Sequence, residues 1–260
     1  MKPTFWQYSR QLAVLVAFKA LGELRTERQR TYLGFLWWFF EPLFLMMVFY
    51  LVFSVFLHRG GDNFVAVLLS GLVLWQWFGS SIMHCTTAIQ VALPLLRSVR
   101  VEPAAFPLAT FLADSIKFTM VLMVLVVVLA ALGHPPSLAW LALPFVLLAE
   151  LLLTCGACLI VAAVVPFIPD LRFVISPLLQ GVFFISGIFF TMDSIAPGAR
   201  HWLEYNPMAV IIDCGRQILL YGKFPDAWRL SRVMLIGLVT LAIGSALIRS
   251  FAQRYPKMAD

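Results

Sequence analysis

The sequence of 260 residues is 62% hydrophobic and 12% charged, and its formal net charge at pH 7 is +6. An average soluble domain has about 25% charged residues, so this composition excludes an ordinary soluble protein. The basic residues do not form one soluble basic face, which argues against a nucleic-acid partner. The positive charge instead indicates anchoring at a membrane surface.

Segment 1–36 contains no stretch that is apolar enough to span a membrane. Within it, Phe5–Glu27 combines apolar side chains such as Trp6 and Phe18 with charged ones such as Lys19. We predict an amphipathic helix in the membrane interface, because tryptophan and basic residues favour the headgroup boundary. The pattern leaves open whether this helix is a simple anchor or a lever at a pore mouth.

Six apolar stretches follow this segment, and a spanning helix needs about 20 mostly apolar residues. We therefore predict an all-α integral membrane protein with six transmembrane helices. The membrane domain is predicted at residues 37–251 and a cytoplasmic tail at 252–260. The six stretches are Trp37–Leu57, Phe64–Met83, Phe111–Leu132, Leu138–Val165, Phe173–Phe190 and Val233–Ile248.

Lysine and arginine are distributed unequally among the connecting segments. Segment 1–36, the second loop, the fourth loop and the tail are basic, whereas residues 133–137 carry no basic side chain. The last loop, 192–232, also contains basic residues and weakens the asymmetry. By the positive-inside rule, we predict that both termini lie in the cytoplasm.

The second loop, His84–Thr110, is longer than a connector between two helices needs to be, which is about 2–8 residues. It contains Pro94, Pro103 and Pro107, which we expect to break the flanking helices. The length of this loop favours a docking role over a plain linker.

The last loop, Met192–Arg232, is too polar for a full span and too long for a turn. Asn206 and Pro207 are a good helix start, and Gly222 is a good stop. We predict two short helices that re-enter the outer leaflet of the membrane between spans five and six. An ordinary extracytoplasmic loop is the alternative.

No enzyme motif occurs in the sequence, and we predict neither catalytic residues nor a metal site. The four histidines are scattered, and neither HExxH nor a Walker A motif is present. A transporter of this kind must therefore take its energy from an ion gradient or from a partner ATPase. The chain has 23 Phe and 8 Trp, and aromatic faces suit the rings of a sliding glycan. Interfacial or lipid-facing positions are the ordinary explanation for most of them.

Several segments occur in an order that is typical of one transporter family. Together they resemble the ABC-2 permeases, and most closely the capsular polysaccharide export permeases of Gram-negative bacteria. The similarity extends from about Leu24 to Arg249. The segments are Leu24-Arg25-Thr26, Tyr32–Trp37, Glu41-Pro42, Arg100–Pro103, Phe106-Pro107, Pro169–Leu171, Phe183–Phe190 and Tyr205–Pro207 with Arg216.

This resemblance implies partners that bind outside the chain. Two permease chains would pair as a homodimer around a central pathway, and two separate ATPase chains would bind ATP and Mg. The cargo would be a lipid-linked capsular polysaccharide. A periplasmic co-polymerase and an outer-membrane export protein would complete the route. O-antigen or teichoic-acid export is the alternative within this class, and an ion-gradient-driven secondary carrier is the alternative from another class.

The resemblance also assigns roles to particular residues. The region 94–107 would contact the ATPase, and 193–228 would form a periplasmic gate. Together with the aromatic pattern, it predicts a substrate pathway from the first and fifth spans. The pathway residues are Trp37, Phe40, Glu41, Phe183, Phe184 and Phe190; the cytoplasmic entrance has Arg28, Arg30, Leu33 and Gly34; ATPase coupling uses Arg97, Arg100 and Glu102; and the gate contains Asn206, Pro207 and Arg216.

Overall fold

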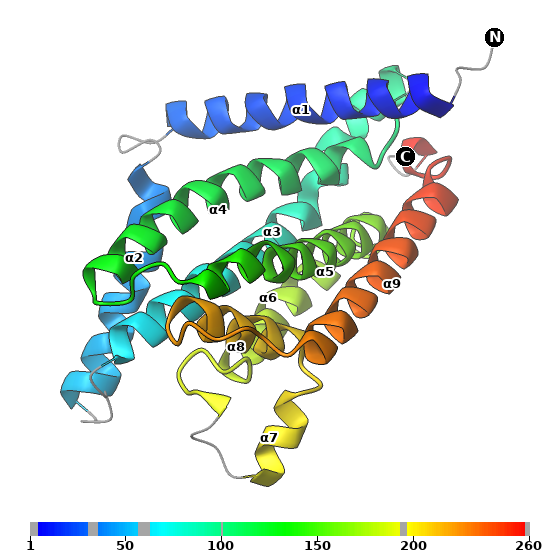
Figure 1. The fold of residues 1–260 in the computed structure, drawn as a ribbon. Helices are drawn as coiled ribbons and strands as arrows, with labels where there is room; N and C mark the ends of the chain where they lie inside the picture. The colour runs from blue at the N-terminus through cyan, green and yellow to red at the C-terminus, as the bar shows by residue number, and fades with distance from the viewer. Residues whose placement is uncertain (1–4, 31–35, 57–62, 100, 193–196, 258–260) are drawn as a thin grey trace.

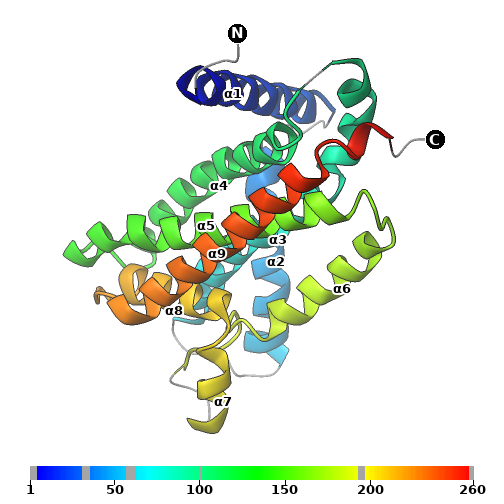
Figure 2. The same ribbon diagram turned by 90° about the vertical axis from the view of Figure 1, so that its right-hand side faces the viewer.

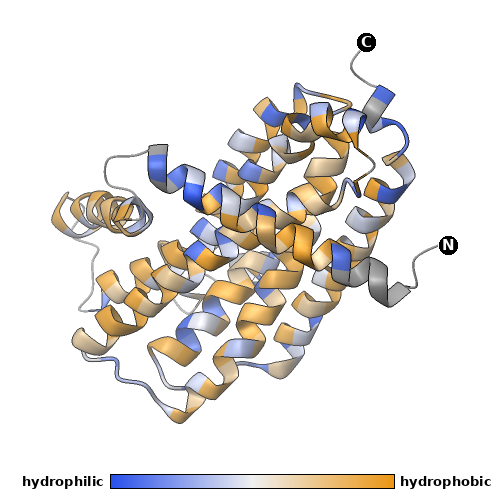
Figure 3. Ribbon diagram, turned by 90° about the horizontal axis from the view of Figure 1, so that it is seen from above, coloured by the Kyte–Doolittle hydropathy of each residue, from blue (hydrophilic) through white to orange (hydrophobic). Residues whose placement is uncertain are grey.

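The computed structural model describes residues 5–30, 36–56, 63–99, 101–192 and 197–257. Across these ranges the chain is helical, and no strand occurs in them (Figure 1). Five of the described helices are long and apolar enough to cross a membrane. Hydrophobic residues cover most of their surface (Figure 3). These helices confirm the prediction of an all-α integral membrane protein in its helical content and in its several apolar helices of spanning length.

Helix α1, Phe5–Arg30, lies across one end of the bundle and packs on α4, Ala105–Ala131 (Figure 1). Ala20 of α1 is fully buried against Ala109 and Ala113 of α4. Small side chains at this contact allow the two helix backbones to approach closely. The predicted N-terminal helix is therefore confirmed as a helix, and its place in the membrane interface stays a prediction.

The first two spans differ in how well they are enclosed. Helix α2, Trp37–Tyr50, continues through a π-helical turn at Leu51–Phe56 and is largely exposed in the single chain. Helix α3, Phe64–Ser98, is the central helix and supplies much of the buried core. Its 35 residues extend about 52 Å, well beyond the roughly 30 Å of hydrocarbon. The helix is therefore longer than the hydrocarbon core, and its last turns lie on the α1 side of the molecule (Figure 1).

The prediction that Pro94 breaks the second helix is wrong. Helix α3 continues through Pro94 to Ser98, and α4 begins at Ala105 with Pro107 in its first turn. A proline costs one backbone hydrogen bond, which long helices tolerate where neighbouring groups compensate for it. The connection between α3 and α4 therefore shortens to residues 99–104, and Pro103 is the proline that lies in it.

Helix α5, Leu143–Val164, follows a 3₁₀ turn at Leu138–Ala142 and packs along α9, Ala227–Phe251. Three glycines bring the two backbones together. A Cβ atom at Gly156 would lie 2.4 Å from the Thr240 hydroxyl and 2.5 Å from the Leu241 amide nitrogen. A Cβ atom at Gly237 or Gly244 of α9 would lie 2.8 or 2.7 Å from the Cβ atom of Leu152 or Leu159 in α5, respectively. Small residues of this kind let membrane helices pack tightly.

Replacing Gly156 with alanine is expected to destabilise the chain, because the rigid backbone of α9 cannot move away from the added methyl. Overpacking of this kind costs about 1–3 kcal/mol or more. Fluorescence-detected size-exclusion chromatography should show a reduced yield of monodisperse protein and a lower thermal midpoint. Gly181→Ala is the matched control, because no atom lies within 4 Å of a Cβ at Gly181. Equal behaviour of the two variants would contradict the assignment of a tight α5–α9 contact.

The fifth predicted span, Phe173–Phe190, is only partly helical. Helix α6, Leu171–Phe184, has 14 residues, and the chain then turns through Gly187, whose φ of +74° favours glycine. At about 21 Å, α6 is shorter than the hydrocarbon core. Figure 2 shows α6 at one edge of the bundle. The prediction of six spans therefore stays a prediction.

Two short helices follow, as the sequence predicts, at the end of the molecule opposite α1 (Figure 1). They are α7, Pro197–Leu203, and α8, Pro207–Leu219. Asn206 caps α8, because its side-chain oxygen accepts hydrogen bonds from the amides of Met208 and Ala209 at 3.0 and 3.4 Å. The helix start at Asn206 and Pro207 is confirmed. Re-entry into the membrane stays a prediction.

The last described residues, Tyr255–Lys257, form a 3₁₀ turn on the same side of the molecule as α1. Tyr255 is fully buried, and its hydroxyl donates a hydrogen bond of 3.2 Å to the carbonyl of Ala163 in α5. Its ring lies against Phe167. These contacts therefore hold the C-terminal end of α9 against the C-terminal end of α5.

Candidate functional site

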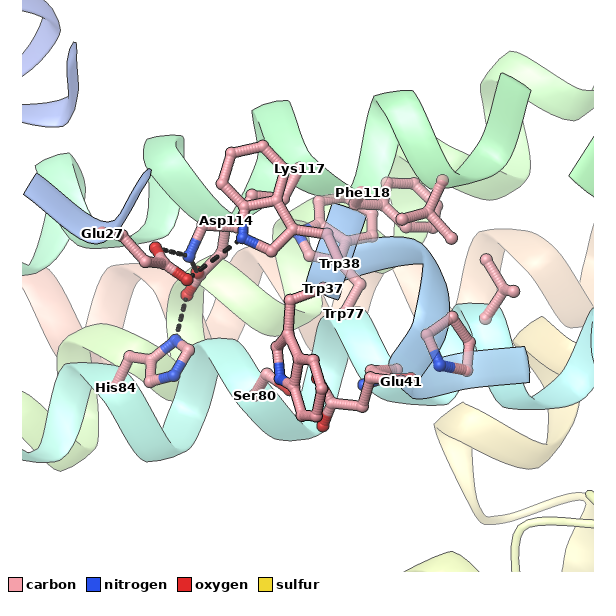
Figure 4. Close-up of a pocket in the computed structure, with 14 residues that line it drawn as sticks. Glu27, Trp37, Trp38, Glu41, Trp77, Ser80, His84, Asp114, Lys117 and Phe118 are labelled. Carbon is pink, nitrogen blue, oxygen red and sulfur yellow. Dashed lines mark hydrogen bonds and ion pairs between the residues drawn. The ribbon is translucent and has the colours of Figure 1, made fainter. Parts of the chain in front are cut away.

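A pocket opens between α1, α2, α3 and α4 (Figure 4). Its volume is about 270 Å³, and its walls combine indole rings with carboxylate, amide and hydroxyl groups. Trp37 and Trp38 come from the start of α2. Trp77 comes from α3 and stacks on Phe118 of α4, with ring centroids 4.2 Å apart. The aromatic walls are therefore fixed by packing between three helices.

A chain of charged side chains closes one wall of this pocket (Figure 4). The Lys117 ammonium lies 2.5 Å from a carboxylate oxygen of Glu27 and 3.2 Å from one of Asp114. The other oxygen of Asp114 lies 2.9 Å from the Nδ1 atom of His84. The Trp38 indole donates a hydrogen bond of 3.1 Å to Glu27. These contacts join all four helices, so a displacement of α1 must act on the first span.

The sequence does not predict this network of Glu27, Lys117, Asp114 and His84. Asp114 and Lys117 are three residues apart, and that spacing signals a pair on one face of α4. Glu27 and His84 are distant in sequence, and only the packing of α1 and α3 on α4 brings them together. Glu41, which the sequence does predict, also lines this pocket.

A second pocket, of about 360 Å³, lies between α2, α3 and α6. Glu41, Gln76, Ser80 and His84 line both pockets, so the two pockets are neighbours on the polar face of α3, and we refer to them together as the groove. Phe183 of α6 lies in the wall of the second pocket. The structure therefore places the first and fifth predicted spans on opposite sides of one groove.

The structure places some of the predicted pathway residues in the walls of these two pockets and others outside them. Trp37 and Glu41 line the first pocket, and Glu41 and Phe183 line the second. Phe40 and Phe184 lie outside the walls of both, with about half of each side chain exposed. The assignment of these residues to a substrate pathway stays a prediction.

An aromatic cluster closes the end of the groove that is remote from α1. Phe189 is its centre, with ring centroids 4.7 Å from Phe49, 5.2 Å from Phe53 and 5.2 Å from Phe183. Phe184 also contacts Phe189. Phe190 is the residue that the sequence predicts here, but the side chain that lies in the cluster is that of Phe189. The irregular backbone after α6 decides which of the two points inward.

Arg216 of α8 holds this irregular backbone in place. Its guanidinium donates hydrogen bonds of 2.6, 2.7 and 3.0 Å to the carbonyls of Gly187, Ile188 and Phe190. It also donates two hydrogen bonds, of 3.1 and 2.8 Å, to the carbonyl of Val67 in α3. Burial lowers the pKa of Arg216 to about 10, which leaves it charged at neutral pH. One side chain thereby satisfies the carbonyls that the broken helix leaves free.

Asn206 also forms hydrogen bonds to the irregular segment that follows α6. Its side-chain amide donates hydrogen bonds of 3.3 Å to the Ile185 carbonyl and 3.1 Å to the Ser186 hydroxyl. Two of the predicted gate residues, Asn206 and Arg216, therefore hold the segment that carries Phe189. Their function as a gate stays a prediction.

The sequence profile of the ABC-2 type transporter family matches residues 20–220, which include the groove and the Arg216 contacts. The chain belongs to the ABC-2 type transporter family. It is 27% identical over 235 residues to the O-antigen export system permease protein RfbA of Myxococcus xanthus, over 90% of each chain. It is 28% identical to the polysialic acid transport protein KpsM of Escherichia coli, over 88% of this chain and 90% of the relative. The capsule polysaccharide export inner-membrane protein CtrC of Neisseria meningitidis is 26% identical, over 90% of this chain and 89% of the relative.

Of the remaining predicted site residues of this ABC-2 permease, Pro207 lines a pocket beside α9, and Arg97 and Glu102 lie at the junction of α3 and α4. Arg97 is exposed in the last turn of α3, and Glu102 lies in the short connection to α4. Arg100, Leu33 and Gly34 lie outside the described residues, as do the side chains of Arg28 and Arg30. The coupling and entrance assignments stay predictions.

Proposed function

We propose that this chain is the transmembrane subunit of an ATP-driven exporter that moves a lipid-linked polysaccharide across the bacterial inner membrane. The observation that carries the proposal is the groove between α2, α3 and α6. Both aromatic rings and polar groups line it, and Phe49 and Phe183 in its wall contact Phe189. The relatives that carry out polysaccharide or O-antigen export match this chain over most of its length.

The chemistry of the groove suits a sugar chain. Aromatic faces bind the C–H faces of sugar rings, and carboxylate and amide oxygens accept hydrogen bonds from hydroxyl groups. Glu41 and Gln76 supply such oxygens where the two pockets meet, and the side-chain oxygen of Gln76 is buried without a hydrogen-bond partner among the described residues. Many weak contacts of this kind guide a polymer along the groove without holding it at one position.

A capsular polysaccharide is the cargo that we propose, and an O-antigen is the second candidate. The Glu41-Pro42 pair at the start of α2 favours the capsule branch. The named relatives include permeases for both kinds of polymer, which is the reason for keeping the second candidate. Analysis of the sugars that remain inside a deletion strain separates the two.

The energy source in this proposal is a separate ATPase that binds ATP and Mg. No Walker A motif occurs in the sequence. The last turns of α3 support a contact with such a partner, because this helix is longer than the hydrocarbon core. A second permease copy would cover the exposed apolar surface of α2 and α6, where Phe44 and Phe173 are largely exposed in the single chain. In the proposed orientation both termini are cytoplasmic, and α7 and α8 face a periplasmic co-polymerase and an outer-membrane export protein.

Reversing the charge of Arg97 tests the proposed ATPase contact. Arg97→Glu is expected to lower transport-coupled ATP hydrolysis by up to about fivefold, since an exposed ion pair is worth up to about 1 kcal/mol. The measurement compares ATPase activity of the purified complex in nanodiscs at low and high salt. Lys223→Glu is the control, because Lys223 is exposed and follows α8, which lies at the end of the molecule opposite α1 (Figure 1). Unchanged activity of the Arg97 variant at both salt concentrations would contradict the contact.

A further inference from the structure

A third pocket, of about 260 Å³, lies at the end of the molecule opposite α1 and outside the groove. The segment between α7 and α8 forms one wall, and the first turns of α9 form the other. Arg229 and Arg232 line it, three residues apart on one face of α9. The proposed function gives this pocket no part in transport.

The two arginines have unused hydrogen-bonding capacity. The Nε atoms of both are buried and have no hydrogen-bond partner among the described residues. Arg229 is held by Asp213 of α8, whose carboxylate lies 2.8 Å from its guanidinium. A buried donor without a partner costs about 1–3 kcal/mol, so an acceptor that enters the pocket removes that cost.

The charge around the pocket favours a negatively charged group. Asp213 balances Arg229, and the carboxylate of Glu204 at the rim has Arg200 3.9 Å away. Arg232 has no ion-pair partner among the described residues. At the amino end of α9, the carboxylate of Asp226 accepts a hydrogen bond from the Trp228 amide and offsets the partial positive charge of the helix end.

Below the arginines the pocket is apolar. Val233, Leu235 and Ile236 continue its lining along α9, toward the middle of the bundle. Leu235 is 62% exposed, and Ile236 is partly exposed. This stretch belongs to a helix that is long and apolar enough to span the membrane. A basic end that continues into an apolar strip is the arrangement that a phospholipid requires.

We propose that this pocket binds a membrane phospholipid, with its phosphate on Arg229 and Arg232 and an acyl chain along Leu235 and Ile236. The guanidinium groups donate to the phosphate oxygens, as Arg does at many phosphate sites. The lipid then fastens α9 to the segment before α8, and so to the helix that carries Arg216. The proposal does not depend on which polymer the permease carries.

Native mass spectrometry of the purified full-length chain tests this proposal, with phosphatidylglycerol as the probe and diacylglycerol as its phosphate-free counterpart. Arg232→Gln is expected to reduce retained phosphatidylglycerol about tenfold, whereas Arg232→Lys should retain an intermediate amount. Arg249→Gln, at the other end of α9, should retain as much as the wild type. Wild-type protein should retain little diacylglycerol.

A photoreactive acyl chain on the same probe locates the site, and its crosslinks should fall on the peptide that contains Leu235 and Ile236. Thermal melting confirms that each variant is folded, and Arg232→Lys keeps the test valid if Arg232→Gln does not fold. Equal retention by the wild type and the folded Arg232 variants would overturn the proposal. Equal retention of diacylglycerol, or full competition by glycerol 3-phosphate, would overturn the assignment to a phospholipid.

Discussion

Replacing Arg216 with methionine is expected to cause the largest loss of stability of any single change in this chain. The substitution removes five hydrogen bonds and leaves the carbonyls of Gly187, Ile188 and Phe190 without this donor, whereas the Val67 carbonyl still accepts from the Ser70 hydroxyl. Each buried carbonyl without a partner costs about 1–3 kcal/mol. Removing the buried charge offsets part of this cost, so we expect a net loss of about 3–5 kcal/mol.

The measurement is the yield and thermal midpoint of detergent-purified protein. Arg216→Lys should be intermediate, because an ammonium has three donors and no planar fork to span the separate carbonyls. Lys223→Met is the control, since it removes a positive charge from an exposed position close by in the sequence. If Arg216→Met melted within one degree of the wild type, the segment after α6 would have to be held by other contacts.

Replacing Phe183 with alanine is expected to reduce polysaccharide export several-fold more than it reduces the amount of protein. Phe183 lines the groove and contacts Phe49, Trp75 and Phe189. Aromatic pairs contribute about 0.5–1.5 kcal/mol each beyond the area that they bury. Losing these contacts removes both a sugar-stacking face and support for the closed end of the groove.

Phe145→Ala is the control for this prediction. Phe145 lies on α5, is 59% exposed and lines neither pocket of the groove. The measurement is surface polysaccharide per cell, normalised to permease in the membrane by immunoblot. Equal export by the two variants at matched protein levels would show that the polymer does not pass along the groove.

Features that depend on local sequence were predictable for this chain. Apolar stretches of sufficient length located the long helices, and Asn206 with Pro207 located the start of α8. The amphipathic pattern of Phe5–Glu27 located α1, whose helix ends three residues later at Arg30. Local signals sufficed in these places because each depends on residues within a few turns of one another.

Features that depend on packing between distant segments were not predictable. The break expected at Pro94 does not occur, and α6 ends at Phe184, although apolar residues continue to Phe190. That end depends on Arg216, which is 26 or more residues away and supplies the donors that a turned backbone requires. The Glu27–Lys117–Asp114–His84 network likewise exists only once three helices have packed. Sequence spacing can suggest the pair within α4 but not its partners.

Polysaccharide export in cells tests the central claim most directly. A strain that lacks this permease should lose surface polysaccharide and accumulate polymer inside the inner membrane. Export should return when the wild-type permease is expressed together with its ATPase, and not when that ATPase carries a disabled Walker A lysine. Surface polysaccharide at wild-type amounts in the deletion strain, or its full recovery with the disabled ATPase, would contradict the account.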